Sequence, residues 1–313
     1  MLFGEVLAGS SRAWFLDVWG LFVTLPLYLG HVLLLWMVAA KTEKTSLVQL
    51  YCLGMIFGLY EAFLTKVLWA GYWDQQNAGF GKFAGISMLE FPMLVFFWHP
   101  VMSFILPIIA FQKLTGKKLI ADHEQLIAKG RWRGIALLIL VALLSSFLAS
   151  GAQFDVVSAN LAFGGSLIIV LVLRLAARGA TIQSLLFDRF GNLVLAALMA
   201  IGYVAWTMLV LPQNLPTDAQ SYVSIAIAYL VAIFMFLTAQ PKTNNEAKTE
   251  GFPTRYWVGL VAIYWVTLNV WLVVPDISTS VLSITYLALC GAGALFAGTL
   301  LAGSIRRFVY PNR

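Results

Sequence analysis

Long, uninterrupted apolar runs constrain this chain more than any other feature. Most of them reach the roughly 20 residues that a helix needs to cross the hydrocarbon core of a bilayer. The runs do not alternate in polarity, which excludes a transmembrane β-barrel. The composition agrees, because 61% of the 313 residues are hydrophobic and only 11% are charged, whereas a soluble domain carries about 25% charged residues. We therefore predict an all-α integral membrane protein, a bundle of about nine transmembrane helices.

We expect the nine spans to form a single transmembrane domain over residues 1–313. The fourth and fifth spans are divided only by the polar stretch at 153–155. Two longer polar segments interrupt the series: a basic loop at 113–133 and a linker at 240–256, both predicted to be cytoplasmic. The expected spans are 18–40, 46–70, 87–112, 134–151, 157–176, 190–211, 221–239, 257–275 and 281–303. Such a pattern places the protein in the cell membrane, inner or plasma, as a multi-pass protein.

The basic residues gather in alternate loops. If the N-terminus lies outside, all 20 Lys and Arg residues except Arg12, Lys66 and Lys82 fall on the cytoplasmic side. This distribution follows the positive-inside rule and predicts an outside N-terminus and a cytoplasmic C-terminus. Because the net charge of +6 is explained by these loops, we expect no nucleic-acid partner.

The span at 46–70 contains ionisable residues that a bilayer tolerates only for a reason. Such residues usually face the interior of the bundle and have partners there. At 100° per residue, they share one helical arc with small residues that allow a second helix to approach closely. The arc comprises Gly54, Gly58, Glu61, Ala62, Thr65 and Lys66. Two interpretations of Glu61 stay open: it binds a proton or a substrate cation, with Lys66 as its neutralising partner, or it is a structural carboxyl bonded to a neighbouring helix.

The span at 87–112 adds a carboxyl near its outer end and a histidine near mid-depth. Glu90 should lie at the depth of Lys66, so an ion pair is one interpretation and exposure to outer water is the other. His99 is followed by Pro100, and a proline in a span removes a backbone hydrogen bond. We therefore expect the helix to break at this point.

The first span carries a polar stripe that descends from the outer surface. Asp17, Thr24, Tyr28 and His31 follow helical spacing on one face. His31 and His99 should both lie roughly 18 Å below the outer surface. Two histidines at one depth could ligate a haem iron or another metal, although intramembrane histidines are more often hydrogen-bonded packing residues. The leading expectation is therefore that the protein has no cofactor.

The polar residues of the outer half favour a small-solute or ion-coupled transporter with an outward-facing polar cavity. The predicted solute- or ion-binding residues are Glu61, Lys66, Glu90, Asp17, Tyr28 and Thr65. One alternative is a membrane-embedded enzyme that acts on a lipid-linked substrate at the outer leaflet, with Glu61 or Glu90 as general base. The other is a haem-binding or structural subunit of a membrane complex. Whether the protein is an enzyme is left open, since no HExxH, phosphate-loop or dinucleotide motif occurs.

The expected partners are the lipid bilayer, a small polar or lipid-linked substrate and a second copy of the chain. In the last span, small residues recur every four positions, a spacing typical of close helix contact. The residues of this face are Cys290, Ala294, Gly298 and Ala302.

Overall fold

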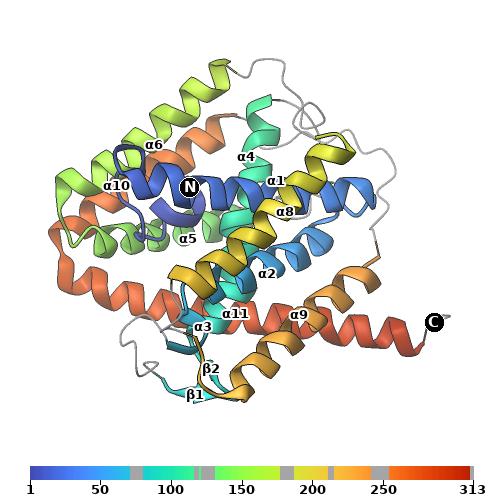
Figure 1. The fold of residues 1–313 in the computed structure, drawn as a ribbon. Coiled ribbons are helices and arrows are strands. Elements are labelled where there is room, and N and C mark those ends of the chain that lie inside the picture. The colour runs from blue at the N-terminus through green and yellow to red at the C-terminus, as the bar shows by residue number, and fades with distance from the viewer. Residues whose placement is uncertain are drawn as a thin grey trace. The chain divides into compact units, whose positions relative to one another are not determined.

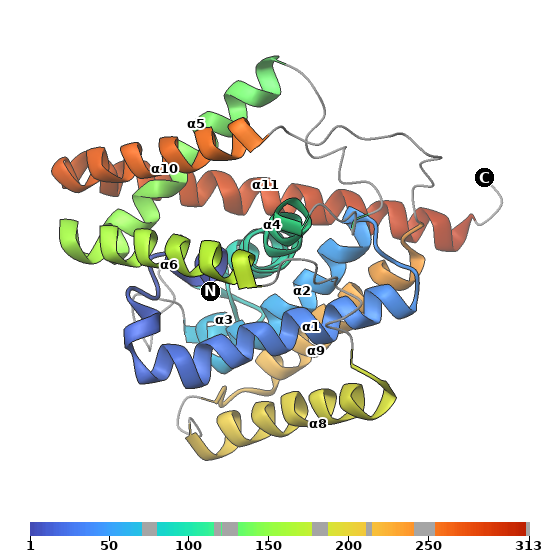
Figure 2. The ribbon, with the colours of Figure 1, turned by 90° about the horizontal axis from the view of Figure 1, so that it is seen from above.

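The predicted class and number of spans are confirmed. The computed structural model describes residues 1–70, 80–115, 120, 131–176, 187–210, 215–240 and 254–310 (Figures 1 and 2). Within these ranges, nine helical segments are long and apolar enough to cross a membrane. They are Gly20–Lys41, Leu47–Leu64, Pro92–Gln112, Trp132–Gly151, Val156–Ala176, Arg189–Met208, Ala219–Thr238, Arg255–Val273 and Pro275–Val309. Most of the linker at 240–256, the loop residues 71–79 and most of the basic loop at 113–133 lie outside the described residues.

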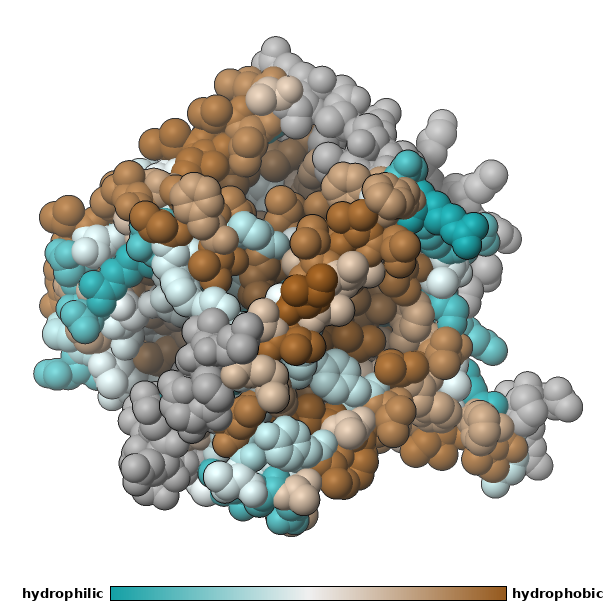
Figure 3. Space-filling view, viewed as in Figure 1, coloured by the Kyte–Doolittle hydropathy of each residue, from teal (hydrophilic) through white to brown (hydrophobic). Residues whose placement is uncertain are grey.

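The surface of these helices is largely apolar. Large hydrophobic side chains such as Leu173, Leu198 and Leu230 are more than half exposed, and brown, hydrophobic residues cover much of the face drawn in Figure 3. Soluble monomers rarely expose large apolar patches. Contact with the lipid bilayer accounts for this surface.

The helices form two compact units. Unit 1 comprises Met1–Tyr28, Ile109–Ala180 and Lys242–Tyr286, and unit 2 comprises Leu29–Ile108, Thr181–Pro241 and Leu287–Arg313. Three helices contribute residues to both units: α1 (Leu25–Lys41), α4 (Leu106–Thr115) and α11 (Pro275–Val309).

Unit 1 is built around α10, which packs against α5 and α6. Neutral polar groups join these helices. The hydroxyls of Ser145 and Thr267 lie 2.8 Å apart between α5 and α10. Between α6 and α10, the Asn160 amide donates to the Asn269 side-chain oxygen at 2.9 Å. The elements of this unit are η1 (Leu2–Val6), η2 (Trp14–Leu16), η3 (Gly20–Thr24), α5 (Arg131–Gly151), α6 (Val156–Ala176) and α10 (Thr254–Val273).

Unit 2 is built around α2, which packs most extensively against η4 and also against α9. A short antiparallel hairpin, in which Lys82 pairs with Ser87, adds two small strands that the all-helical prediction did not include. The elements of this unit are α2 (Leu47–Leu64), α3 (Val67–Ala70), β1 (Lys82–Phe83), β2 (Ile86–Ser87), η4 (Pro92–Ile105), α8 (Arg189–Ala205), η6 (Trp206–Val210) and α9 (Ala219–Thr238).

The start of α2 is fixed by a capping box. The Ser46 hydroxyl accepts from the Gln49 amide, and the Gln49 side chain accepts from the Ser46 backbone N–H, so two helix-end donors are satisfied. Gln49 also donates to the Ala239 carbonyl at 3.0 Å. Lys44 Nζ donates to the Phe236 and Leu237 carbonyls at the end of α9, where a cation is favourable. These contacts tie α2 to α9.

The expected helix over 46–70 is interrupted. α2 ends at Leu64, and Lys66 adopts a left-handed backbone with φ 62°. The Lys66 N–H donates to the Phe63 carbonyl at 3.0 Å and closes the last turn, as residues at helix C-termini commonly do. The chain then continues as the buried segment α3.

The helix break expected at His99 is not found. η4 continues through Pro100 as a wide-turned π-helix of 14 residues. Wide turns are usually single and are frequent at functional sites. Here a wider turn relieves the clash between the proline ring and the carbonyl four residues before it, so the helix is distorted without being broken.

Candidate functional site

The centre of the candidate site is a carboxyl–imidazole pair between α2 and η4. Glu61 Oε2 lies 2.9 Å from His99 Nε2, and the two side chains are 13% and 2% exposed. This is the usual length of a hydrogen bond in which an imidazole N–H donates to a carboxyl oxygen. The pair can therefore hold or pass a proton inside the membrane-spanning part of unit 2.

Two glycines of α2 allow this pairing. A Cβ at Gly54 would lie 2.4 Å from the Pro100 Cα, and a Cβ at Gly58 would lie 3.2 Å from the His99 Cβ. The small-residue ridge predicted on this face is thus confirmed as a close helix contact, and η4 is the helix that approaches it. Because the backbones are so near, the short Glu61 side chain reaches His99.

Aromatic rings pack on the His99 side of the pair. The His31 ring stacks on Phe57 with centroids 4.8 Å apart and the planes nearly parallel, and Phe57 lies 5.2 Å from the His99 ring. Tyr60 meets the other edge of His31 at 4.0 Å. The two histidines predicted at equal depth therefore both contact Phe57, and an apolar ring excludes water from their neighbourhood.

A second aromatic layer connects this cluster to α8. Tyr60 donates its hydroxyl to the Met199 carbonyl at 2.9 Å, and its ring lies 4.6 Å from that of Tyr203. Phe63 stacks on Tyr203 at 5.1 Å. These contacts join α2 to α8 at Tyr60 and Phe63, one residue before Glu61 and two residues after it.

The Glu61 carboxyl is paired with a histidine and not with the expected lysine. Lys66 follows the helix end and is half-buried. Thr65 is exposed, and its hydroxyl donates to the Glu61 carbonyl at 3.1 Å. Both residues therefore belong to the turn that ends α2, since the arc that grouped them with Glu61 assumed an unbroken helix.

Glu90 is enclosed, contrary to the interpretation that it faces outer water. Its side chain is 0% exposed. Within the described residues neither carboxyl oxygen has a hydrogen-bond partner, so the ion pair with Lys66 is not formed.

Two of the predicted solute-binding residues belong to unit 1. Asp17 is exposed and accepts the Gly20 N–H at 2.8 Å, which caps η3. Tyr28 is 4% exposed. The structure therefore assigns Asp17 a local role at a helix start.

No group of three or more His, Cys, Asp or Glu residues that could hold a metal ion occurs among the described residues. His99 Nε2 is engaged by Glu61. Ligation of a haem iron through this nitrogen would require that contact to be broken, because one imidazole nitrogen cannot serve both partners.

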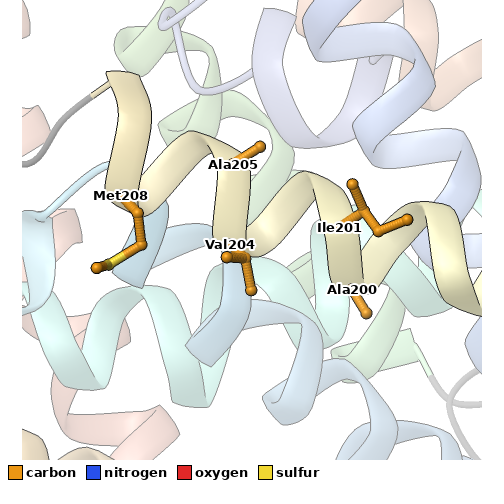
Figure 4. Close-up of a pocket in the computed structure, with 5 residues that line it drawn as sticks. All are labelled: Ala200, Ile201, Val204, Ala205 and Met208. Carbon is orange, nitrogen blue, oxygen red and sulfur yellow. The ribbon is translucent and has the colours of Figure 1, made fainter.

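A hollow of about 460 Å³ lies along the outward face of α8 and η6 (Figure 4). Its lining is entirely apolar and comprises Ala200, Ile201, Val204, Ala205 and Met208. Binding sites for polar solutes need a few convergent polar groups, which this hollow lacks. It suits lipid better than a polar solute.

Comparison with known proteins identifies the class but no activity. The sequence matches an uncharacterised membrane protein family over residues 1–309. The chain belongs to this family. A relative described as an uncharacterised protein from Archaeoglobus fulgidus is 42% identical over 107 residues, which are 34% of this chain and 32% of the relative. The chain thus matches about a third of that relative's length. No solved structure matches the chain.

The pairing of Glu61 with His99 was missed in the sequence, although a signal was present. Glu61 lies nine residues before Ala70, and His99 lies twelve residues after Ser87. At 1.5 Å per residue, these positions are about 14 Å and 18 Å from the outer ends of the expected spans. Similar depth on adjacent antiparallel helices, with glycines between them, would have indicated the pair.

Proposed function

We propose that the protein is an ion-coupled transporter of a small solute, with Glu61 and His99 as the coupling site. The observation that carries the proposal is the 2.9 Å contact between Glu61 Oε2 and His99 Nε2. Titratable residues within spans mark ion pathways and proton relays. Histidine is the side chain whose charge most readily changes near physiological pH. A carboxyl–imidazole pair can therefore take up one proton and release it in another conformation.

The helices around the pair support this proposal. Transporter sites are commonly formed by discontinuous helices near the middle of the bilayer. α2 ends at Leu64, three residues after Glu61, and the left-handed Lys66 follows. η4 is wide-turned around His99. Glu61 retains 13% exposure whereas His99 has 2%, so we infer that ions and solute reach the pair from the Glu61 side.

The other predicted solute-binding residues take different parts in the proposal. Lys66 remains the group that would hold an anionic part of the solute, since it lies half-buried beside the end of α2. Thr65 and Asp17 serve helix ends and are demoted to supporting positions. Tyr28 stays a candidate solute-binding residue, although it is buried and belongs to unit 1.

Solute uptake into sealed liposomes tests the proposal. A panel of labelled sugars, amino acids and carboxylic acids is offered with and without an inside-alkaline pH gradient. We expect one class of solute to accumulate only with the gradient. Glu61→Gln and His99→Gln should each reduce that uptake at least about tenfold, because each removes one of the two titratable groups of the coupling site. A tenfold reduction corresponds to about 1.4 kcal/mol of free energy. The double variant should be no worse than either single one.

Glu43→Gln is the matched control, because Glu43 is exposed between α1 and α2. Full gradient-driven uptake by Glu61→Gln, or no uptake of any panel member, would contradict the transporter. Consumption of a lipid-linked substrate in detergent, without sealed vesicles, would favour the enzyme alternative instead.

We also propose that the N-terminus is outside and the C-terminus cytoplasmic, as the Lys and Arg distribution predicts. Lys82 and Lys41 are exposed at opposite expected ends of the spans. In intact cells, a membrane-impermeant thiol reagent should label Lys82→Cys and spare Lys41→Cys. The two native cysteines are buried and provide the background. Labelling of Lys41→Cys alone would reverse the topology.

The haem alternative makes a separate prediction. Because Glu61 occupies His99 Nε2, we expect protein purified after expression with sufficient haem to be colourless. An absorbance band in the visible range that disappears in a His31→Ala/His99→Ala variant would overturn this expectation and assign His31 and His99 to a haem iron.

The proposed homo-oligomer would use the exposed small residues of α11. Ala294, Gly298 and Ala302 are exposed, and a Cβ at Gly298 would meet open space. Cys290 is buried instead and donates to the Leu89 carbonyl. The face available to a second copy is therefore one residue shorter than predicted.

A further inference from the structure

Three buried side-chain oxygen atoms lie just before the start of η4, apart from the Glu61–His99 pair. Glu90 and Ser87 are both 0% exposed. Within the described residues, neither carboxyl oxygen of Glu90 nor the Ser87 hydroxyl has a hydrogen-bond partner. Buried polar groups are nearly always satisfied, and a buried charge without a partner is costly. The three oxygens therefore indicate an occupant.

The chain brings these oxygens close to one another. A turn at Met88 and Leu89 connects Ser87 to Glu90, and the first and last residues of a turn have Cα atoms within about 7 Å. Both side chains point away from solvent. They can thus reach one small ligand between them.

The backbone around Ser87 is held in place by α9. The Ser221 hydroxyl donates to the Gly85 carbonyl at 2.8 Å, and the Ser224 hydroxyl donates to the Ala84 carbonyl at 2.7 Å. Gly85 has a φ of 76° and contacts Ser221 so closely that a Cβ would clash. The hairpin is therefore fixed before any ligand binds, as a binding site requires.

α11 contacts the turn between Ser87 and Glu90. Cys290 donates its thiol to the Leu89 carbonyl at 3.3 Å. The thiol thus occupies the Leu89 carbonyl and leaves the Glu90 oxygens to another partner.

We propose that Glu90 and Ser87 bind an alkali cation of the sodium type. Oxygen atoms of carboxylates and hydroxyls are the ligands that hard cations prefer. One carboxylate balances one positive charge, so a divalent ion would leave an uncompensated charge in the membrane. A proton would satisfy one of the three oxygens directly, whereas a cation can coordinate all of them. The site is separate from the Glu61–His99 pair and does not depend on its role.

Two lysines are the competing sources of positive charge. Lys82 is the register partner of Ser87, but its side chain is exposed. Lys66 is half-buried and precedes α3, which packs against β2. Neither forms an ion pair with Glu90 among the described contacts. Replacing either lysine therefore tests whether it supplies the charge.

Thermal unfolding of the purified protein in detergent tests the proposal at constant ionic strength. We expect the Tm to rise saturably by several degrees when sodium chloride replaces choline chloride, since a ligand that binds only the folded state stabilises it. Glu90→Gln should abolish this rise. Ser87→Ala should increase the half-saturating sodium concentration by about tenfold, the effect of one lost ligand of typical hydrogen-bond strength.

Three controls keep the result interpretable. Glu43→Gln and Glu61→Gln should both retain the sodium-dependent rise, so that a failure of the transporter proposal leaves this one standing. If Glu90→Gln does not fold, Ser87→Ala alone still has to weaken the sodium effect. An equal Tm in sodium and choline, or a sodium effect that survives Glu90→Gln, would overturn the site. Loss of stability in Lys66→Met or Lys82→Met together with sodium independence would assign the counter-charge to that lysine.

Discussion

The helix pairs α2–η4 and α5–α10 both consist of membrane-spanning helices, but different contacts hold the two pairs together. In α2–η4 the backbones touch at Gly54 and Gly58, and an ionisable pair lies between them. In α5–α10 the glycines Gly134 and Gly259 meet open space. The helices of that pair are joined instead by neutral groups such as the Ser145 and Thr267 hydroxyls. Close backbone contact thus accompanies an ionisable pair, and neutral hydrogen bonds join the helices whose glycines meet open space.

The difference in backbone contact between the two helix pairs is tested most directly by adding one methyl group to a glycine of each pair. Gly54→Ala places a Cβ 2.4 Å from the Pro100 Cα, and overpacking of this kind costs about 1–3 kcal/mol. Gly259→Ala meets nothing within 4 Å and should be neutral or stabilising by up to about 1 kcal/mol, because alanine favours helix. Thermal unfolding in detergent measures both. Equal stabilities of the two variants would show that the α2–η4 contact is looser than described.

The sequence was sufficient to predict the nine spans, because a bilayer requires about 20 apolar residues for each crossing. It also indicated the buried face of α2, since glycine spacing within one helix is visible in the sequence. It did not indicate which helix would cover that face. Partners across helices depend on three-dimensional packing, and for that reason His99 was missed as the partner of Glu61.

The predicted positions of Lys66 and Glu90 failed for a local reason. A helical wheel assumes constant rotation per residue, but the left-handed backbone at Lys66 ends that rotation. The assumption that residues near a span end face water failed at Glu90, which is 0% exposed and follows a turn that α11 contacts through Cys290 and Leu89. Neither the left-handed turn nor the hairpin has a hydrophobic period that a sequence would reveal.

A smaller effect is expected from the neutral contacts of unit 1. Asn269→Leu removes the hydrogen bonds between Asn160 and Asn269, and interhelical bonds in membranes contribute about 0.6 kcal/mol on average. We expect a modest decrease in Tm and unchanged gradient-driven uptake. Val266→Leu, on the exposed face of α10, is the control. Loss of uptake in Asn269→Leu at an unchanged Tm would place function in unit 1 and erase the distinction between the two pairs.

The smallest effect on stability is expected from a feature found in both units, an aspartate that caps the start of a helix. A hydrogen bond from the Ser158 side chain lowers the pKa of Asp155 at α6, and the Ser221 backbone N–H lowers the pKa of Asp218 at α9. A lowered pKa means that the cap stabilises the fold above the ordinary value of 3.8 and that this contribution is lost as the pH falls through the lowered value.

The Tm of Asp155→Asn and that of Asp218→Asn should therefore each fall slightly less on acidification than the Tm of the parent protein. Melting curves over a series of acidic pH values measure this slope. A change in only one variant would show that the two caps do not contribute alike. Both aspartates lie at the surface, so salt should weaken the effect.

The close approach of Gly54 to Pro100 also has a consequence for descent. No side chain fits at position 54 while the backbone at position 100 stays where it is, so we expect position 54 to remain glycine wherever this backbone contact is kept. Lineages that lose the glycine must also move or rebuild the segment that carries His99. We therefore expect positions 54, 58, 61 and 99 to be inherited as a block, and a family member that lacks both glycines to have lost the carboxyl–imidazole pair as well.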